Sequence, residues 1–289
     1  MQKVVASFIF FGTAVFVPQA SWGAVIYNNL TPNNLIGVAT RPDVGAFEIE
    51  AADDFVLTSP AEITNASFTG LFVGGTGTPT ISDLVVEIYR VFPADSNTTR
   101  MPNVPTRANS PSDVAFDSRD SATAGDLTFS TSTVSATFST LNSIQPGGIH
   151  AFPNQATLGD GAVTGQEVQV NVTFLMPFEL PSDHYFFVPQ VTLSSGQFFW
   201  LSAPRPITGA GTTPFPAGFT DLQSWTRDQF LDPDWLRVGT DIVDGTSPPT
   251  FNASFSLSGN VLPEPVSTTL VVAGLALLAW RARGRRALR

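Results

Sequence analysis

The sequence predicts an all-β fold, an antiparallel β-sandwich of jelly-roll type, and three observations lead to it. Short runs in which apolar and polar residues alternate recur through the middle of the chain, while helical periodicity is scarce. Turns rich in glycine and proline separate these runs. Strand-favouring residues are abundant, among them 24 phenylalanines. Many short strands joined by polar turns are typical of β-sandwiches.

Each expected strand follows from its own pattern. Alternation with one apolar face predicts half-buried strands at 47–51, 168–174 and 251–257. More continuous apolar runs predict strands buried on both faces at 84–86, 185–188 and 198–201. Because no repeat of fixed period is present and strand-like sequence resumes after each loop, a single all-β ectodomain over residues 24–260 is expected.

Composition and charge exclude several classes of protein. The chain of 289 residues has no cysteine, so it holds no disulfide scaffold, thiolate metal site or cysteine nucleophile. Its net charge of −10 is unevenly distributed, because residues 25–262 carry eight bases and 23 acids, a net charge of −15. Such an acidic middle argues against binding to nucleic acid or to an anionic membrane.

The N-terminus has the three parts of a secretory signal peptide. Lys3 precedes the apolar run Val4–Val17, and the small residues Ser21 and Gly23 follow it. We therefore expect residues 1–23 to be a signal peptide cleaved after Gly23. A buried N-terminal helix is the alternative.

The C-terminus has the features of a membrane anchor. The segment Val266–Trp280 contains no charge and would span about 22 Å as a helix, short of a hydrocarbon core of about 30 Å. Flanking residues or local thinning of the bilayer would cover the difference. Arginines follow it, and basic flanks stay cytoplasmic, so the ectodomain is expected outside the cell. A core helix that ends in surface arginines is the alternative.

The last part of the chain, residues 261–289, resembles the PEP-CTERM sorting signal of Gram-negative bacteria. Three features carry the resemblance, in this order: the motif Pro263, Glu264, Pro265; the apolar segment 266–280; and the basic cluster Arg281, Arg283, Arg285, Arg286. The resemblance implies that an exosortase recognises the chain, removes the tail and delivers the protein to the cell surface or the exopolysaccharide of a biofilm. The protein would be the substrate of that enzyme.

Parts of the ectodomain also resemble exported bacterial β-sandwich domains with varied C-terminal anchors and a PEP-CTERM ectodomain subfamily. The segments concerned are 25–29, 52–57, 104–107 and 116–120. This resemblance implies a fold and no site.

No catalytic residue can be assigned from the sequence. His150 and His184 are the only histidines, and no nucleophile elbow or paired-histidine zinc motif is present. Glycoside hydrolysis needs only two carboxyl groups, but nothing singles out one pair among the 23 acids of the middle. We therefore expect a protein that is not an enzyme and has no cofactor other than a possible structural calcium ion.

Two ligand sites are considered. Asp228, Asp232 and Asp234 lie close together in the sequence and carry the hard oxygen ligands that Ca²⁺ prefers, with turn and capping acids as the alternative. Trp225 and Trp235 stand in polar surroundings where exposed rings would stack on sugars, with core packing as the alternative.

The leading hypothesis is an exported, non-enzymatic surface or matrix protein with a structural or adhesive role. Its expected partners are exosortase, extracellular polysaccharide and, before processing, the inner membrane through residues 266–280. A glycan-binding or calcium-dependent adhesion module is the second hypothesis, and a secreted carboxylate glycoside hydrolase is the third.

Overall fold

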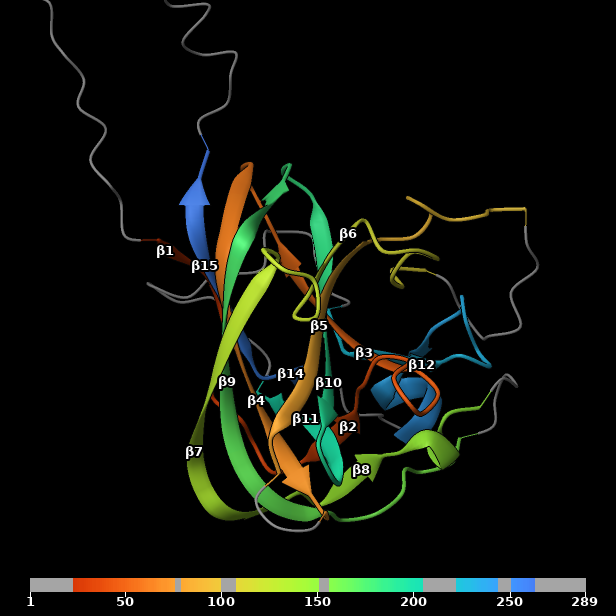
Figure 1. Ribbon diagram of the computed structural model, residues 1–289. Coiled ribbons are helices and arrows are strands. Elements are labelled where there is room, and N and C mark those ends of the chain that lie inside the picture. The colour runs from red at the N-terminus through yellow and green to blue at the C-terminus, as the bar shows by residue number, and fades with distance from the viewer. Residues whose placement is uncertain are drawn as a thin grey trace, which may run out of the picture.

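The described strands form two sheets (Figure 1). The structure is a computed structural model and describes residues 23–75, 79–99, 108–150, 156–204, 222–243 and 251–262. The expected signal peptide and the sorting segment from Pro263 onward lie outside these residues. Within the described part of the chain, no helix is long and apolar enough to span a membrane.

The larger sheet has nine strands. Its main path runs in the order β1-β15-β4-β11-β2-β8, while β14 pairs with β11, and β9 lies between β4 and β7. The strands are β1 (Ala24–Asn28), β2 (Ile36–Ala39), β4 (Ala61–Val73), β7 (Leu127–Ser139), β8 (Asn142–Ile144), β9 (Thr164–Leu180), β11 (Gln197–Ala203), β14 (Asn252–Ala253) and β15 (Phe255–Val261).

The smaller sheet has six strands in the order β13-β12-β3-β10-β5-β6. They are β3 (Ile49–Val56), β5 (Ile81–Arg90), β6 (Asp117–Asp120), β10 (His184–Leu193), β12 (Trp225–Asp228) and β13 (Leu236–Arg237). Two short helical turns complete the described elements, η1 (Pro146–Gly148) and the π-helical η2 (Val238–Val243).

An aromatic core joins the inner faces of the two sheets. The ring of Phe187 on β10 stacks on that of Phe255 on β15, with centroids 5.1 Å apart and an interplanar angle of 10°. Phe55 and Trp200 meet the same Phe255 ring at 6.4 and 5.8 Å. The largest fully buried side chains are all aromatic. In a domain without disulfides, burial of these rings is a large contribution to stability.

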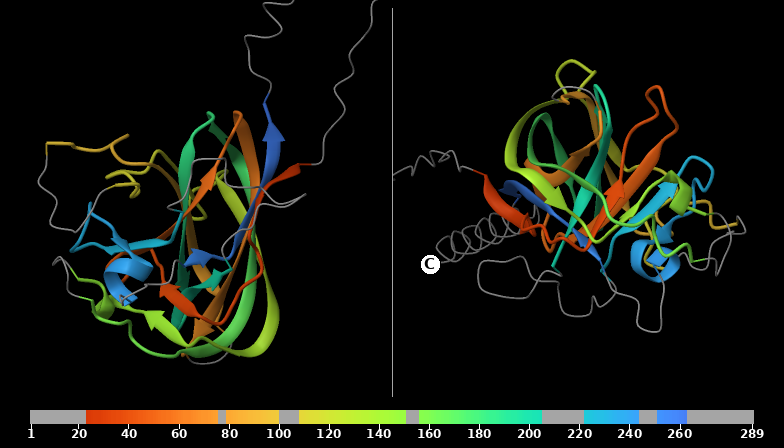
Figure 2. Two further views of the ribbon diagram at one scale, coloured as in Figure 1. Left: turned by 180° about the vertical axis from the view of Figure 1, so that it is seen from behind. Right: turned by 90° about the horizontal axis from the view of Figure 1, so that it is seen from below.

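The all-β prediction is confirmed, and two details differ from the expected pattern. The sheets are not wholly antiparallel, because β2 and β8 run parallel from the pairing of Ile36 with Asn142. Residues 47–51 were expected to begin a half-buried strand, but from Ile49 both faces of β3 are buried. The reason is tertiary. β3 lies between β12 and β10, and the turn at residues 229–235 covers its outer face, on the side away from the larger sheet (Figure 2).

Candidate functional site

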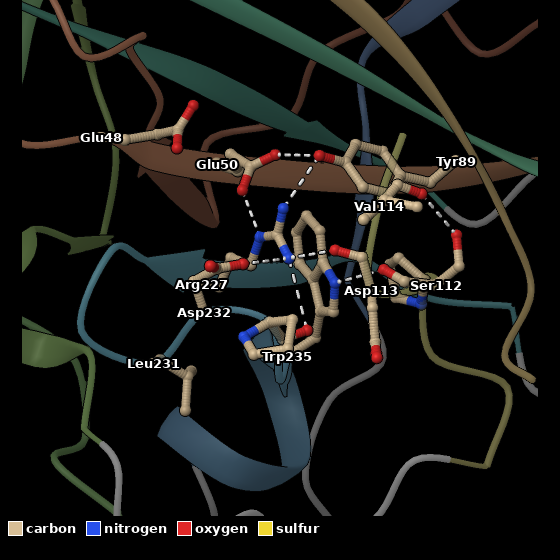
Figure 3. Close-up of polar contacts among 12 residues, drawn as sticks. Glu48, Glu50, Tyr89, Ser112, Asp113, Val114, Arg227, Leu231, Asp232 and Trp235 are labelled. Atoms are coloured by element: carbon tan, nitrogen blue, oxygen red, sulfur yellow. Dashed lines mark hydrogen bonds and ion pairs between the residues drawn. The ribbon is translucent and has the colours of Figure 1, made fainter. Parts of the chain in front are cut away.

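A connected group of buried charged side chains lies on the outer face of the smaller sheet. Alternation along each strand sends Glu50 on β3, Glu87 and Tyr89 on β5, and Arg227 on β12 to this face, opposite the inner face that forms the aromatic core. Arg227 is the register partner of Glu50. We refer to these four residues together with Trp235 as the Arg227 cluster. Figure 3 labels all of its members except Glu87.

The Arg227 guanidinium is the centre of the cluster. Its Nε donates to Glu50 Oε2, and its Nη2 donates to the Tyr89 hydroxyl at 2.8 Å. The Tyr89 hydroxyl in turn donates to Glu50 Oε1 at 2.8 Å and lies 3.1 Å from Glu87 Oε2. The Trp235 ring lies 4.3 Å from the guanidinium carbon, in cation–π geometry. Arg227, Glu50 and Tyr89 are 4%, 2% and 3% exposed, so the charges meet away from water.

The same guanidinium also holds two covering segments. Its Nη1 donates to the carbonyl oxygens of Asp113 and Pro233, at 3.2 and 3.3 Å, and pairs with the Asp232 carboxylate at 2.8 Å. The Trp235 indole N–H donates to the Ser112 carbonyl at 3.2 Å. One buried cation therefore ties the 112–113 segment and the 229–235 turn to β3 and β5 (Figure 3).

Burial and neighbouring negative charge raise the pKa values of two acids on this face, Glu87 and Glu48. Burial, followed by the neighbouring Glu50 carboxylate, raises the pKa of half-buried Glu87 to about 8. Burial and then Glu50 also raise the pKa of Glu48, whose Oε1 accepts a hydrogen bond from Gln190 at 3.1 Å. Burial alone would lower the pKa of Arg227, but Glu50 and Tyr89 raise it above its ordinary value, so the guanidinium stays charged.

A pair of carboxyl groups, one protonated and one ionised, is the arrangement that a glycoside hydrolase uses. Glu87, whose pKa is raised to about 8, and Glu50 both contact the Tyr89 hydroxyl. Access argues against the role, because the Glu50 carboxylate is engaged by Arg227 and Tyr89 under the covering segments. The geometry fits a role in holding segments of the fold together better than it fits an open active site.

The pH dependence of stability tests the state of Glu87. Because its folded pKa is raised from about 4.5 to about 8, the folded protein keeps a proton there that the unfolded chain releases. The stability from this group is full below pH about 4.5 and is lost as the pH rises towards 8.

We expect Glu87→Gln to flatten the fall in unfolding free energy across this range, measured by urea denaturation. Glu179→Gln, on an exposed position of β9, should keep the wild-type slope. An unchanged slope in Glu87→Gln would contradict the assignment.

The tryptophans expected as a sugar-stacking platform are in the interior. Trp225 and Trp235 are 0% and 1% exposed. Both belong to one apolar group on the outer face of the smaller sheet, with Ala52, Phe186 and others. Their rings pack against protein, so the exposed platform is corrected in favour of the core-packing alternative. The 229–235 turn folds back onto the sheet, which the polar sequence around both residues did not reveal.

The three aspartates expected at a calcium site have separate contacts. Asp228 caps its own turn, accepting hydrogen bonds from the backbone of Phe230 and Leu231 at 3.0 and 2.9 Å. Asp232 pairs with Arg227, and Asp234 is buried. Among the residues that the structure describes, no three acidic or histidine side chains form a group that could hold a metal ion. The positions of Asp228 and Asp232 fit the turn-acid alternative.

Another buried carboxylate, Asp53 on the inner face of β3, was also not singled out from the sequence. It accepts hydrogen bonds from the backbone N–H of Ala253 at 2.8 Å and from the Ser224 hydroxyl at 3.1 Å. Burial, followed by the charge of Asp54, raises its pKa well above the ordinary value. Asp53 thus connects β3 to β14 and to the start of β12. The outer neighbour Asp54 lies 2.9 Å from His184 Nε2.

Comparisons with known proteins add no name to these features. No family model, no curated protein and no solved structure matches the chain. The fold defines an all-β protein of two sheets, and its function has to be inferred from the chain itself.

Proposed function

We propose that this chain is an exported bacterial surface or extracellular-matrix protein, sorted by exosortase through its C-terminus. Its ectodomain, a jelly-roll-like sandwich, would have a structural or adhesive role without catalysis. The observation that carries the proposal is the succession, in the sequence, of three features: the motif Pro263, Glu264, Pro265, the uncharged segment 266–280 and the arginines after it. Its resemblance to a PEP-CTERM signal supports the sorting step.

The two ends of the ectodomain are compatible with attachment at one place. β1 and β15 are antiparallel neighbours, with Ala24 opposite Gly259. The chain therefore enters the first strand and leaves the last one at the same end of the sheet. The Leu262 N–H donates to the Pro60 carbonyl at 2.8 Å, one residue before the Pro-Glu-Pro motif. An anchor after Leu262 would leave the rest of the domain projecting from the membrane.

The buried charges support a structural role for the ectodomain. Arg227 donates hydrogen bonds to Glu50, to Tyr89 and to backbone carbonyls. Asp53 accepts its hydrogen bonds from other groups of the fold. Groups used in this way hold segments together rather than act on a substrate.

A second function, glycan-binding adhesion, is favoured by the outer face of the larger sheet. Uncharged hydroxyl and amide side chains form a hydrogen-bonded ladder there, with Ser67 to Asn171 at 2.8 Å, Asn65 to Thr173 at 3.0 Å and Gln169 to Asn171 at 2.7 Å. Each hydroxyl and amide of the row has more donor and acceptor positions than these bonds use, so the row can also bind sugar hydroxyls.

The sorting proposal is tested by the C-terminal mass of the surface protein. In a host with exosortase, we expect the mature protein to lack residues 281–289, and in an isogenic host without the enzyme to retain them. Replacing Pro263, Glu264 and Pro265 by alanine should also cause retention. Pro248→Ala with Pro249→Ala is the matched control and should be processed normally. Surface protein that keeps Arg281–Arg289 in the exosortase host would refute the proposal.

A further inference from the structure

The larger sheet has one long edge that no described residue pairs with. β7 is hydrogen-bonded along one side to β9 and has no partner on the other among the described strands. It lies at the margin of the sheet beyond β9 (Figure 1). Most of its 13 residues are exposed, on both faces of the strand. A row of backbone N–H and C=O groups is thereby available to another strand.

The other strands that end a described sheet are less suited to pairing. β8 has three residues, and β13 and β14, which pairs only with β11, have two each. β6 has four, and its sequence Asp-Ser-Arg-Asp is charged. β1 has five and an irregular register with β15 between Val25 and Tyr27. Short length, charge and bulges are the usual means by which proteins protect sheet edges, and each of these strands has at least one.

β7 has no charge and no proline. The whole stretch 127–149 lacks Asp, Glu, Lys and Arg, in a chain with a net charge of −10. Its residues are Thr, Ser, Val, Phe and Ala after Leu127, and the β-branched and aromatic ones favour strands. In such an acidic protein, a neutral edge is where two copies can approach without like-charge repulsion.

The first half of β7 is the regular half. From Leu127 to Thr133 it pairs with β9 residue by residue, from Phe174 to Val168. Irregularities follow between Thr133 and Ser135 and between Ser135 and Phe138. Bulges hinder further pairing, so only the half before them offers a straight edge.

We propose that residues 127–133 of β7 pair antiparallel with the same residues of a second copy of this chain. A strand that pairs antiparallel with its own copy is related to it by a two-fold axis, the commonest symmetry of dimers. The two nine-stranded sheets would become one continuous sheet across the dimer. The pairing uses the ectodomain alone and does not depend on exosortase sorting.

Single cysteines test the pairing in the full-length chain. Because the protein has no cysteine, one introduced thiol can form a disulfide only with another copy. Thr128→Cys, Ser130→Cys and Ser132→Cys place it along the outward face of the regular half. Directly opposite residues of an antiparallel pair lie about 4.5–5.5 Å apart at Cα, within the range of a disulfide. Thr173→Cys on β9 is the control, since three strand spacings already separate its two copies by more than about 14 Å.

With an added oxidant, we expect a covalent dimer that is strongest at Ser130→Cys, since Ser130 lies opposite its own copy in this pairing, and that is absent at Thr173→Cys. Absence of the dimer at Ser130→Cys, or equal yields on β7 and β9, would overturn the proposal. This readout is separate from the C-terminal mass that tests sorting, so either proposal can fail alone.

Charge variants provide an independent measurement. Ser130→Lys and Ser130→Asp should each abolish the dimer in sedimentation experiments, because like charges would meet across the axis. Mixing the two variants should restore it as a heterodimer. Thr173→Lys is the matched control and should dimerise like the wild type. Equal melting temperatures of Ser130→Lys and Thr173→Lys would show that the fold is intact, and failure of the mixture to associate would refute the pairing.

Discussion

Replacing Arg227 by methionine is expected to lower the free energy of unfolding by about 3–5 kcal/mol, the usual cost of removing one partner of a buried ion pair. The Glu50 carboxylate, 2% exposed, would lose the guanidinium that compensates its charge. The 112–113 segment and the 229–235 turn would also lose their common donor. Chemical denaturation followed by tryptophan fluorescence measures the change, since Trp235 packs on Arg227.

A second arginine of the same sheet provides the control. Arg90 on β5 pairs with Asp183 at 3.0 Å, but their side chains are 34% and 41% exposed. An exposed pair contributes about 0–1 kcal/mol, so Arg90→Met should have a small effect. Adding Glu50→Gln to Arg227→Met should recover part of the loss, because the uncompensated charge is removed. If Arg227→Met is no more destabilising than Arg90→Met, the cluster does not hold the covering segments.

Truncating Phe255 to alanine is expected to destabilise the protein by about 3–5 kcal/mol, the range for a phenylalanine in a packed core. Its ring is fully buried and contacts the rings of Tyr27, Phe55, Phe187 and Trp200. Because these residues belong to both sheets, the cavity would open at the contact between them. Thermal and urea unfolding of the variant measure the effect.

Phe230 is the matched control for that truncation. It is 72% exposed in the turn after β12, although its ring lies 5.6 Å from that of Phe47. Exposed substitutions usually change stability by about 0.5 kcal/mol or less, so Phe230→Ala should be close to neutral. Similar losses in the two variants would contradict the assignment of Phe255 to a packed centre.

Sequence patterns predicted the strands better than they predicted the side-chain contacts between strands, such as that of Arg227 with Glu50. The alternation at 168–174 and 251–257 corresponds to inward-facing side chains in β9 and in β14 and β15, because a period of two arises within one strand. The alternation at 47–51 placed Glu48 and Glu50 on one face but made that face appear exposed. Nothing local indicated that Arg227, 177 residues later, would lie against Glu50.

The same distinction explains the tryptophans. Trp225 and Trp235 have polar neighbours in the sequence, which suggested an exposed face. In the fold, Ser224, Thr226 and Arg227 donate hydrogen bonds to β3, while the tryptophan rings pack in the apolar group on the outer face of the smaller sheet. Burial of a large side chain depends on which segment folds over it, and a short window of sequence does not contain that information.

The sequence by itself determined the all-β class, the absence of disulfides, the acidic middle and the three-part C-terminal segment on which the sorting proposal depends, because each is local or compositional. Only the tertiary structure decided that Glu50, Glu87, Tyr89 and Arg227 form one cluster, and that β7 is the long unpaired edge among the described strands. Both depend on pairing between strands far apart in the chain. The physical reason is that strand order and burial are set by long-range packing, whereas alternation records only which side of its own strand a residue faces.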